Sequence, residues 1–267
     1  MKKPIEISSA ANAQFKIWKS LLNSKGIKEN QLFILMGSKL IEEFLKSISS
    51  TEQPAFQIEF LLRTAEQNIP ALINKLNSHN LSHLKEAVLP TPLFTELDVL
   101  GTHSPLLVLS FKNFALKNMN DEPEGLEVIC PLGDPRNLGA LTRSAQGFGA
   151  REIILTQESA HPYLPHSIKA SAGAVLQLQF KRTADKISAL PLVGENFALE
   201  LHGEKIHTIK WPKNIRIWIG EEGPGLQLEL SQKKKMKFVH IPTNSIESLN
   251  ATVSASIAFW EWKKTQL

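Results

Sequence analysis

Apolar and polar positions follow two different periods along this chain, and their alternation predicts an α/β protein. Short apolar runs typical of strands occur at residues 32–36, 58–62, 87–89 and 106–111, and helical spacing at 12–24, 38–46, 69–76 and 91–100. Strands that alternate with helices predict βαβ units and a mostly parallel sheet.

The same alternation resumes after a break in the pattern. Residues 112–125 lose periodicity and gain Asn, Asp, Glu, Pro and Gly, which is typical of a linker. Strands are then predicted at 126–130, 152–155, 197–201, 215–220 and 238–241, and a helix begins near Asn137, a residue suited to cap it. We therefore predict a first domain over residues 1–111, a linker over 112–125 and a second domain over 126–267.

The last helix has the clearest spacing in the chain. Leu249, Val253, Ile257 and Trp260 recur at steps of four, four and three, which predicts that they form its buried face. Ser248 and Asn250 stand at its start, where side chains of this type accept hydrogen bonds from unpaired backbone N–H groups.

Composition narrows the class of protein without identifying it. The 267 residues are 42% hydrophobic and 21% charged, and their apolar runs fall short of the roughly 20 residues that a membrane helix needs. The N-terminus lacks the apolar core of a secretory signal, and the single cysteine, Cys130, predicts a buried thiol in a reducing cytoplasm. A net charge of +4 is compatible with a nucleic-acid partner but does not specify one.

Three loops that follow predicted strands combine glycine with polar side chains, at residues 134–139, 220–225 and 243–250. In open α/β sheets, ligands bind at the carboxyl ends of strands. These loops match neither the dinucleotide fingerprint nor a phosphate-binding P-loop, which disfavours a Rossmann oxidoreductase. The chain also lacks metal-ligand spacing of Cys and His, so we expect no metal.

In order along the chain, these loops form three sequence blocks. The blocks are DPRNLGALTRSAQGFGA with Asn137, Gly139 and Arg143, IGEEGPGL with Gly220, Glu222, Gly223 and Gly225, and IPTNSIESLNATVSAS with Ile241, Pro242, Ser248, Leu249 and Asn250. Together with KASAGA at 169–174, they resemble the SpoU (TrmH) family of RNA ribose methyltransferases, in the SPOUT superfamily. The third block departs from the family pattern, since it is one residue shorter and lacks the usual glycine.

This resemblance covers residue 126 to the C-terminus. The N-terminal half resembles, mainly through residues 12–44, the small substrate-binding domain that many family members carry, which is related to ribosomal proteins that bind RNA kinks. For the second domain, the family implies an α/β sheet with a deep trefoil knot whose loops bind S-adenosylmethionine in a bent shape. By position, the implied cofactor-binding residues are Leu199, Glu200, Leu201, Ile219, Gly220, Gly225, Ile241, Leu249 and Ala251.

The implied reaction transfers a methyl group to a ribose 2′-hydroxyl. The catalytic residues carried over by motif are Asn137, Arg143, Glu222, Ser248 and Asn250. Because an arginine normally stays protonated, we assign Arg143 to gripping the phosphate and orienting the hydroxyl. The other four would position the ribose and Arg143.

The family also implies partners. Its members are homodimers with active sites near the interface, and the aromatic tail of Phe259, Trp260 and Trp262 suits either a core or such an interface. The front domain favours ribosomal RNA over tRNA as substrate, and no membrane partner is expected. Two alternatives stay open: methylation of a base, and a catalytically silent RNA-binding or ribosome assembly factor on the same fold.

Overall fold

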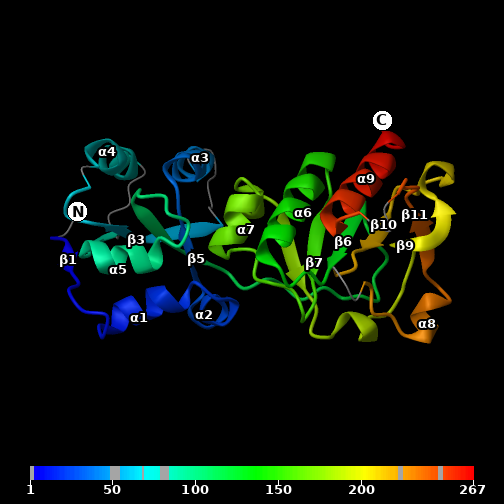
Figure 1. Ribbon diagram of the computed structural model, residues 1–267, viewed down its shortest axis with the longest axis horizontal. Coiled ribbons are helices and arrows are strands. Elements are labelled where there is room, and N and C mark those ends of the chain that lie inside the picture. Colours follow the sequence, from blue (N-terminus) through cyan, green and yellow to red (C-terminus); the bar gives the residue numbers. More distant parts are fainter. Residues whose placement is uncertain (1–2, 49–54, 68, 79–83, 222–224, 246–248) are drawn as a thin grey trace. The chain divides into compact units, whose positions relative to one another are not determined.

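The computed structural model of the protein describes residues 3–48, 55–67, 69–78, 84–221, 225–245 and 249–267. The chain forms two compact units (Figure 1). The first comprises Met1–Asn113 and Tyr163–Lys169, and the second comprises Phe114–Pro162 and Ala170–Leu267. The chain therefore passes between the units three times.

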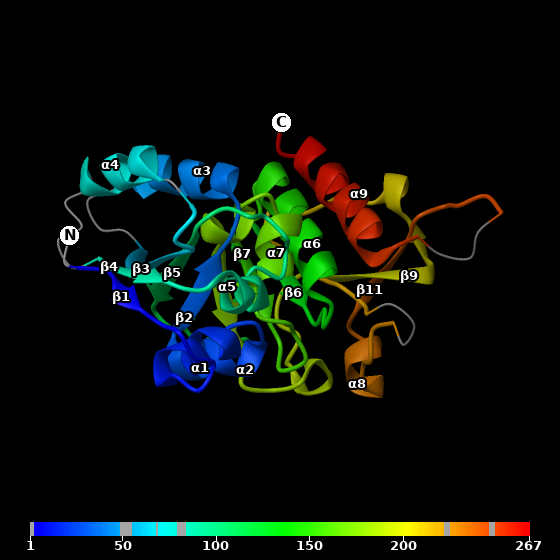
Figure 2. The same cartoon turned by 60° about the vertical axis from the view of Figure 1, so that its left-hand side comes forward.

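The first unit is a five-stranded sheet with helices on both faces. Helices α3 and α4 cover one face, and α1, α2 and α5 cover the other (Figures 1 and 2). The strand order is β1-β4-β3-β5-β2. Its elements are β1 (Ile5–Glu6), α1 (Ala13–Ser20), α2 (Ser24–Asn30), β2 (Leu32–Leu35), α3 (Ser38–Ile48), β3 (Phe56–Arg63), α4 (Pro70–Ser78), β4 (Lys85–Val88), α5 (Thr91–Leu97) and β5 (Leu106–Phe111).

The prediction of a mostly parallel sheet is wrong for this unit. Strand β5 runs antiparallel to both β3 and β2, and only the pairs β1–β4 and β3–β4 are parallel. The chain reverses in the turn before β5, where Gly101 and His103 adopt positive φ. Asp98 holds this turn, since its carboxylate accepts from the Thr102 hydroxyl at 3.0 Å and from the His103 amide at 2.7 Å.

The helix predicted over residues 12–24 ends at Ser20, and a second helix begins at Ser24. Asn12 caps α1, and Asn23 caps α2 by accepting from the amide of Gly26 at 2.9 Å. A second capping side chain starts a new helix rather than continuing the old one. Helix α2, which the sequence interpretation missed, is therefore signalled by Asn23.

The core of the first unit includes a side chain from far along the sequence. The Tyr163 ring packs against Phe33, Phe111 and Phe56, with centroid distances of 4.7, 5.0 and 5.4 Å. Only 5% of Tyr163 is exposed. Residues 1–113 therefore do not contain the whole core of the unit that they form.

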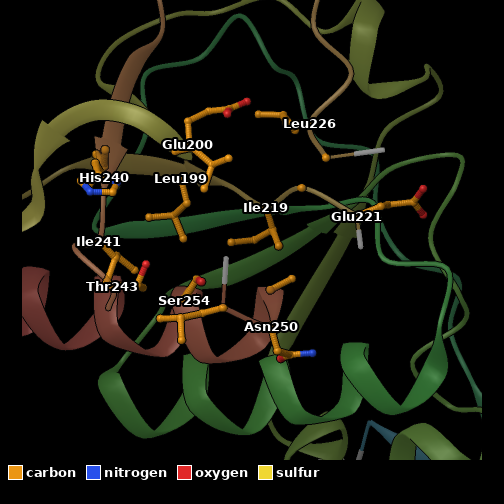
Figure 3. Close-up of a pocket in the computed structure, with 16 residues that line it drawn as sticks. Leu199, Glu200, Ile219, Glu221, Leu226, His240, Ile241, Thr243, Asn250 and Ser254 are labelled. Carbon is orange, nitrogen blue, oxygen red and sulfur yellow. The ribbon is translucent and has the colours of Figure 1, made fainter. Parts of the chain in front are cut away.

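The second unit is a six-stranded sheet in the order β11-β9-β10-β6-β7-β8, and every pair is parallel. Helices α6 (Pro135–Phe148) and α9 (Ala251–Lys264) lie side by side across one face (Figures 1 and 3). Helices α8 (Leu230–Lys233) and η2 (Ile187–Ala189) lie on the other face, where the side-chain amide of Gln232 donates to the carbonyls of Ile187 and Leu190. Its elements are β6 (Leu126–Cys130), α6 (Pro135–Phe148), β7 (Glu152–Leu155), α7 (Pro165–Ala170, shared with the first unit), η1 (Ala174–Leu176), β8 (Gln179–Arg182), η2 (Ile187–Ala189), β9 (Asn196–Lys205), η3 (Ile206–Thr208), β10 (Ile215–Trp218), α8 (Leu230–Lys233), β11 (Lys237–His240) and α9 (Ala251–Lys264).

Most of the segment predicted as a linker lies against this second sheet. The backbone of residues 115–117 pairs with Arg182, and Met119 is buried in the core. Lys117 donates to both Glu127 and Glu152, at 2.6 and 2.7 Å, and all three side chains are nearly inaccessible to solvent. The segment is therefore anchored by buried charges at the amino-terminal ends of β6 and β7.

Three findings bear on the chemistry of the fold. Cys130 is fully buried, and burial raises the pKa of its thiol to about 12, as predicted for an inert residue. In the part of the chain that the structure describes, no helix is both long and apolar enough to cross a membrane. Over the same residues, no group of His, Cys, Asp or Glu is arranged to hold a metal ion.

Candidate functional site

Three loops of the second unit meet in one pocket of about 530 Å³ (Figure 3). They follow the carboxyl ends of the paired parts of β9, β10 and β11, and the first turn of α9 completes the wall. The pocket therefore lies where ligands bind in open parallel α/β sheets. Its volume falls in the range of about 300–1,000 Å³ typical of small-molecule sites.

All nine residues predicted to bind the cofactor line this pocket. They are Leu199, Glu200, Leu201, Ile219, Gly220, Gly225, Ile241, Leu249 and Ala251. The fold thus brings together residues separated by up to 52 positions in the sequence, on three loops and a helix start.

Other lining residues were not predicted: Glu221, Leu226, Val239, His240, Thr243 and Ser254. Ser254 carried a usable signal, because it follows Asn250 by four positions and so lies on the same side of α9. His240 and Thr243 flank the predicted Ile241, but strand and loop periodicity did not distinguish them.

The loop after β10 is held closed by its own backbone. The amides of Glu221 and Gly225 each donate to the other residue's carbonyl, at 3.2 and 3.0 Å. A Cβ added at Gly220 would lie 3.0 Å from the carbonyl carbon of Gly225 and from the amide nitrogen of Leu226. A side chain at position 220 would therefore push these two segments apart.

The carboxylate of Glu221 joins this loop to the loop after β6. It accepts a hydrogen bond from the amide of Gly133 at 3.3 Å. The second sequence block thus contacts Gly133, the residue immediately before the first block. The predicted site residue Glu222 lies outside the described residues, as does Ser248 of the third block.

Asn250 lies in the pocket wall and caps α9. Its side-chain oxygen accepts from the amides of Thr252 and Val253, at 3.0 and 3.3 Å. This confirms the predicted helix cap for Asn250. The cap fixes the start of α9 against the cavity.

The prediction that Asn137 caps α6 is wrong. Asp134 accepts from the amides of Arg136 and Asn137, and Pro135 occupies the first helical position. Proline is favoured there because it has no amide hydrogen to satisfy, so the helix starts earlier than Asn137. Asn137 is half-buried, and its carbonyl accepts from the Thr252 hydroxyl at 3.3 Å, beside the cap of α9.

Arg143 lies in the middle of α6 with its side chain exposed. Among the described residues, no hydrogen bond or ion pair engages its guanidinium. Neither Arg143 nor Asn137 lines the cavity. The helix that carries both is fixed against α9 by the hydrogen bond from Ser256 to Ser144 at 2.7 Å.

The predicted buried face of α9 is wrong. Val253 and Trp260 are 47% and 45% exposed, and Leu249 and Ile257 are only half-buried. The buried residues are Thr252, Ala255, Ala258, Phe259 and Trp262. Thr252, Ala255 and Ala258 let α9 approach α6 closely, and Val253 and Trp260 lie on the outer side.

The lining suits a ligand that is part apolar and part polar. Leu199, Leu201, Ile219, Leu226, Ile241 and Leu249 provide apolar surface, and Glu200, Thr243, Asn250 and Ser254 provide polar groups. A nucleoside that carries an amino-acid chain has both kinds of surface. The residues present therefore fit the cofactor that the sequence blocks imply.

Comparison with known proteins decides the family. Residues 128–260 match the model of the SpoU rRNA Methylase family. An uncharacterized tRNA/rRNA methyltransferase of Borreliella burgdorferi is 30% identical over 58% of this chain and 70% of its own length. The chain belongs to the SpoU rRNA methylase family.

Relatives that match along nearly the whole chain differ in length. Ribosomal RNA small subunit methyltransferase G 2 of Syntrophobacter fumaroxidans is 31% identical over 97% of this chain, which spans about half (49%) of that relative. The 23S rRNA (guanosine(2553)-2′-O)-methyltransferase RlmP of Bacillus subtilis is 24% identical over 94% of this chain and 96% of its own length.

The fold is also that of solved SpoU structures. The SpoU methyltransferase AviRb from Streptomyces viridochromogenes, solved in complex with the cofactor AdoMet, superposes with a TM-score of 0.76. The match covers 96% of this chain and 98% of AviRb at 21% identity. The predicted α/β class is therefore confirmed as the SpoU α/β fold.

Proposed function

We propose that this protein is an S-adenosylmethionine-dependent methyltransferase that acts on a ribose 2′-hydroxyl of RNA, with ribosomal RNA as substrate ahead of tRNA. The observation that carries the proposal is the pocket, which gathers all nine residues implied as cofactor contacts. Family membership and the 2′-O-methyltransferase relative RlmP support it.

The residues divide into two groups with different tasks. S-adenosylmethionine would supply the methyl group: its sulfur–methyl bond would break as the ribose oxygen bonds the methyl carbon, leaving S-adenosylhomocysteine, and the hydroxyl proton would pass to water. The pocket residues hold the cofactor, and the exposed guanidinium of Arg143 grips an RNA phosphate and orients the hydroxyl. Asn137 and Asn250 both contact Thr252 in the first turn of α9, and they position α6 relative to the pocket. Glu222 and Ser248 are assigned to the catalytic residues from their places in the family motifs.

Calorimetric titration with S-adenosylmethionine, followed by methyl transfer to ribosomal RNA, tests this function. Wild type and Arg143→Ala should bind the cofactor equally, whereas transfer should fall at least about 100-fold in the variant, because orientation of the nucleophile is lost. Arg151→Ala removes another exposed arginine, which pairs with Glu124, and serves as the matched control. Binding of RNA without binding of cofactor would instead identify a silent RNA-binding factor.

We also propose that the protein is a homodimer through the outer side of α9. Val253 and Trp260 are exposed there, and the ring of Phe148 from α6 lies 6.0 Å from that of Trp260. Exposed apolar patches mark interaction surfaces. Trp260→Glu should yield a monomer in sedimentation experiments, whereas Leu230→Glu, at a 76% exposed position of α8, should leave the dimer intact. A dimeric Trp260→Glu variant would contradict this proposal.

For the first unit we propose RNA binding, in a domain of residues 1–111 that precedes the catalytic domain of residues 126–267. Support comes from the resemblance of residues 12–44 to the family's substrate-binding domain. Ultraviolet cross-linking of ribosomal RNA to the full chain, followed by peptide mapping, should place cross-links in both domains. Cross-links confined to residues 126–267 would count against the proposed role.

We propose further that the C-terminal segment threads through a loop of the second unit and so forms the trefoil knot of the family. Support comes from the pocket, which this segment lines together with the loops after β9 and β10. Mechanical unfolding from the two chain ends should give a contour length shortened by a tightened knot. An extension to the full length of the chain would refute the knot.

We place the protein in the cytoplasm, where the single thiol stays reduced.

A further inference from the structure

Charge is distributed unequally in the lining of the pocket. Among its 16 lining residues, all within the described chain, two are glutamates, one is a histidine, and none is lysine or arginine. The carboxylate of Glu221 points away from the cavity, and it accepts from Gly133 (Figure 3). Glu200 instead extends across one end of the cavity toward Leu226 (Figure 3). Glu200 is therefore the described lining residue that presents a negative charge to a ligand.

Glu200 reaches this position because β9 leaves the sheet. Phe238 of β11 is paired with Ala198, but the next residue, Val239, is paired with Glu204. Residues 199–203 therefore loop out of the ladder, and the pairing of β9 with β10 also ends at Ala198. We name residues 199–203 the β9 excursion.

Gly203 closes the β9 excursion against β11. A Cβ at this position would lie 2.5 Å from the carbonyl carbon and oxygen of Phe238 and 2.7 Å from the amide nitrogen of Val239. Such distances are far inside van der Waals contact, so a side chain at 203 would push the chain away. The absence of a side chain lets the strand rejoin the sheet at Glu204 and fixes the loop that carries Glu200.

The opposite end of the pocket has the opposite polarity. Asn250, Ala251 and Ser254 belong to the start of α9, a helix of 14 residues. The N-terminus of a helix carries a partial positive charge. The cavity therefore offers a carboxylate at one end and a helix N-terminus at the other, an arrangement that complements a ligand with separated positive and negative groups.

We propose that the Glu200 carboxylate is the group by which the pocket recognises the positive charge of the methyl-donor cofactor. This inference rests on the proposed function and assigns a charge-selecting role to one side chain of the pocket. A unit charge about 6–8 Å away in a partly solvated site changes affinity by roughly threefold to tenfold. The cofactor carries an ammonium and a sulfonium group, and the demethylated product S-adenosylhomocysteine keeps only the ammonium.

Calorimetric titration of the full chain with both compounds tests the proposal. Glu200→Gln should bind S-adenosylmethionine about threefold to tenfold more weakly, and Glu200→Asp, which keeps the charge, should lose less. Glu204→Gln is the matched control, since it removes an exposed carboxylate of the same strand that does not line the pocket and should change affinity less than about twofold. Added salt should weaken binding to wild type more than to Glu200→Gln.

The two ligands separate the outcomes. A parallel loss for S-adenosylhomocysteine assigns Glu200 to the ammonium group, and a loss for S-adenosylmethionine alone assigns it to the sulfonium. An affinity of Glu200→Gln within twofold of wild type would overturn the inference and leave the proposed function standing. A wild-type protein that binds neither compound, with folding verified by circular dichroism, would remove both.

Discussion

Arg216 is fully buried in the second sheet, and replacing it with methionine tests how the fold tolerates charge in its interior. Its Nε donates to Glu127 at 2.8 Å, and its Nη2 and Nη1 donate to the carbonyls of Asp121 and Val193 at 2.6 and 3.2 Å. The guanidinium thus ties the strand pair β6–β10 to two loops. Arg216→Met keeps much of the side-chain volume and removes all these bonds.

The expected loss of stability follows from the buried groups that Arg216→Met leaves without their partner. Removing one partner of a buried ion pair costs about 3–5 kcal/mol, because the other charge stays buried. Lys117 still donates to Glu127 at 2.6 Å, which reduces the cost of leaving the Glu127 charge without Arg216. Each carbonyl left without its donor adds roughly 1 kcal/mol. We therefore expect the free energy of unfolding of the second unit to fall by about 3–5 kcal/mol.

Urea unfolding followed by tryptophan fluorescence measures this loss. Four of the five tryptophans belong to the second unit, and Trp218 lies two residues from Arg216 on β10. Arg151→Met is the control: this arginine pairs with Glu124 at the surface, where an ion pair contributes about 0–1 kcal/mol. A loss below about 1 kcal/mol for Arg216→Met would refute the reasoning, since the network would then contribute no more than a surface pair.

Three further predictions concern other parts of the chain. Burial raises the pKa of Glu127, but hydrogen bonds from Lys117 and Arg216 outweigh burial and hold that pKa below its usual value. The ionised Glu127 therefore stabilises the fold above about pH 4.3, and this contribution is lost as the pH falls through the lowered pKa. Urea titrations from pH 6 to 3 should therefore show a steeper loss of stability in wild type than in Glu127→Gln, and equal slopes would contradict this. Gly220→Ala should weaken calorimetric S-adenosylmethionine binding about tenfold by separating the pocket walls, whereas Gly147→Ala, where a Cβ meets nothing within 4 Å, should bind normally. Tyr163→Ala should destabilise the first unit by about 3–5 kcal/mol, reported by the fluorescence of Trp18, its single tryptophan, and an unchanged Trp18 transition would refute the placement of Tyr163 in that core.

Strands bounded by turn-forming or polar residues could be predicted from the sequence. The strands Leu106–Phe111, Leu126–Cys130 and Glu152–Leu155 were predicted with the bounds that the structure gives them. Each is a short apolar run between turn-forming or polar residues, so local pattern and tertiary packing agree. The convergence of the loops after β9, β10 and β11 was predicted from the family resemblance that the sequence blocks carry. Periodicity alone showed only that loops follow strands, and the loop of residues 134–139 does not line the pocket.

What the sequence could not predict depended on the packing partner. The four-four-three spacing in α9 correctly indicated a helix, but it selected Val253 and Trp260 for the core when small residues pack on α6. Periodicity reports that a face is apolar and does not say what covers it. The antiparallel course of β5 likewise depends on a turn held by Asp98, which strand patterns do not record.

Strand β9 shows how stability and the site share one element. At its amino end, the Asn196 side chain donates to the carbonyls of Val193 and Gly194 at 3.0 and 2.9 Å and accepts from the Trp218 indole at 2.9 Å. The strand is thereby fixed to β10 before it leaves the sheet after Ala198. Buried Arg216 and the hydrogen bonds of the Asn196 side chain hold the amino end of β9. The carboxyl end can therefore leave the regular strand pairing and form the pocket wall. Substitutions at Asn196 should therefore reduce stability and cofactor affinity together, whereas those at Glu200 should change affinity alone.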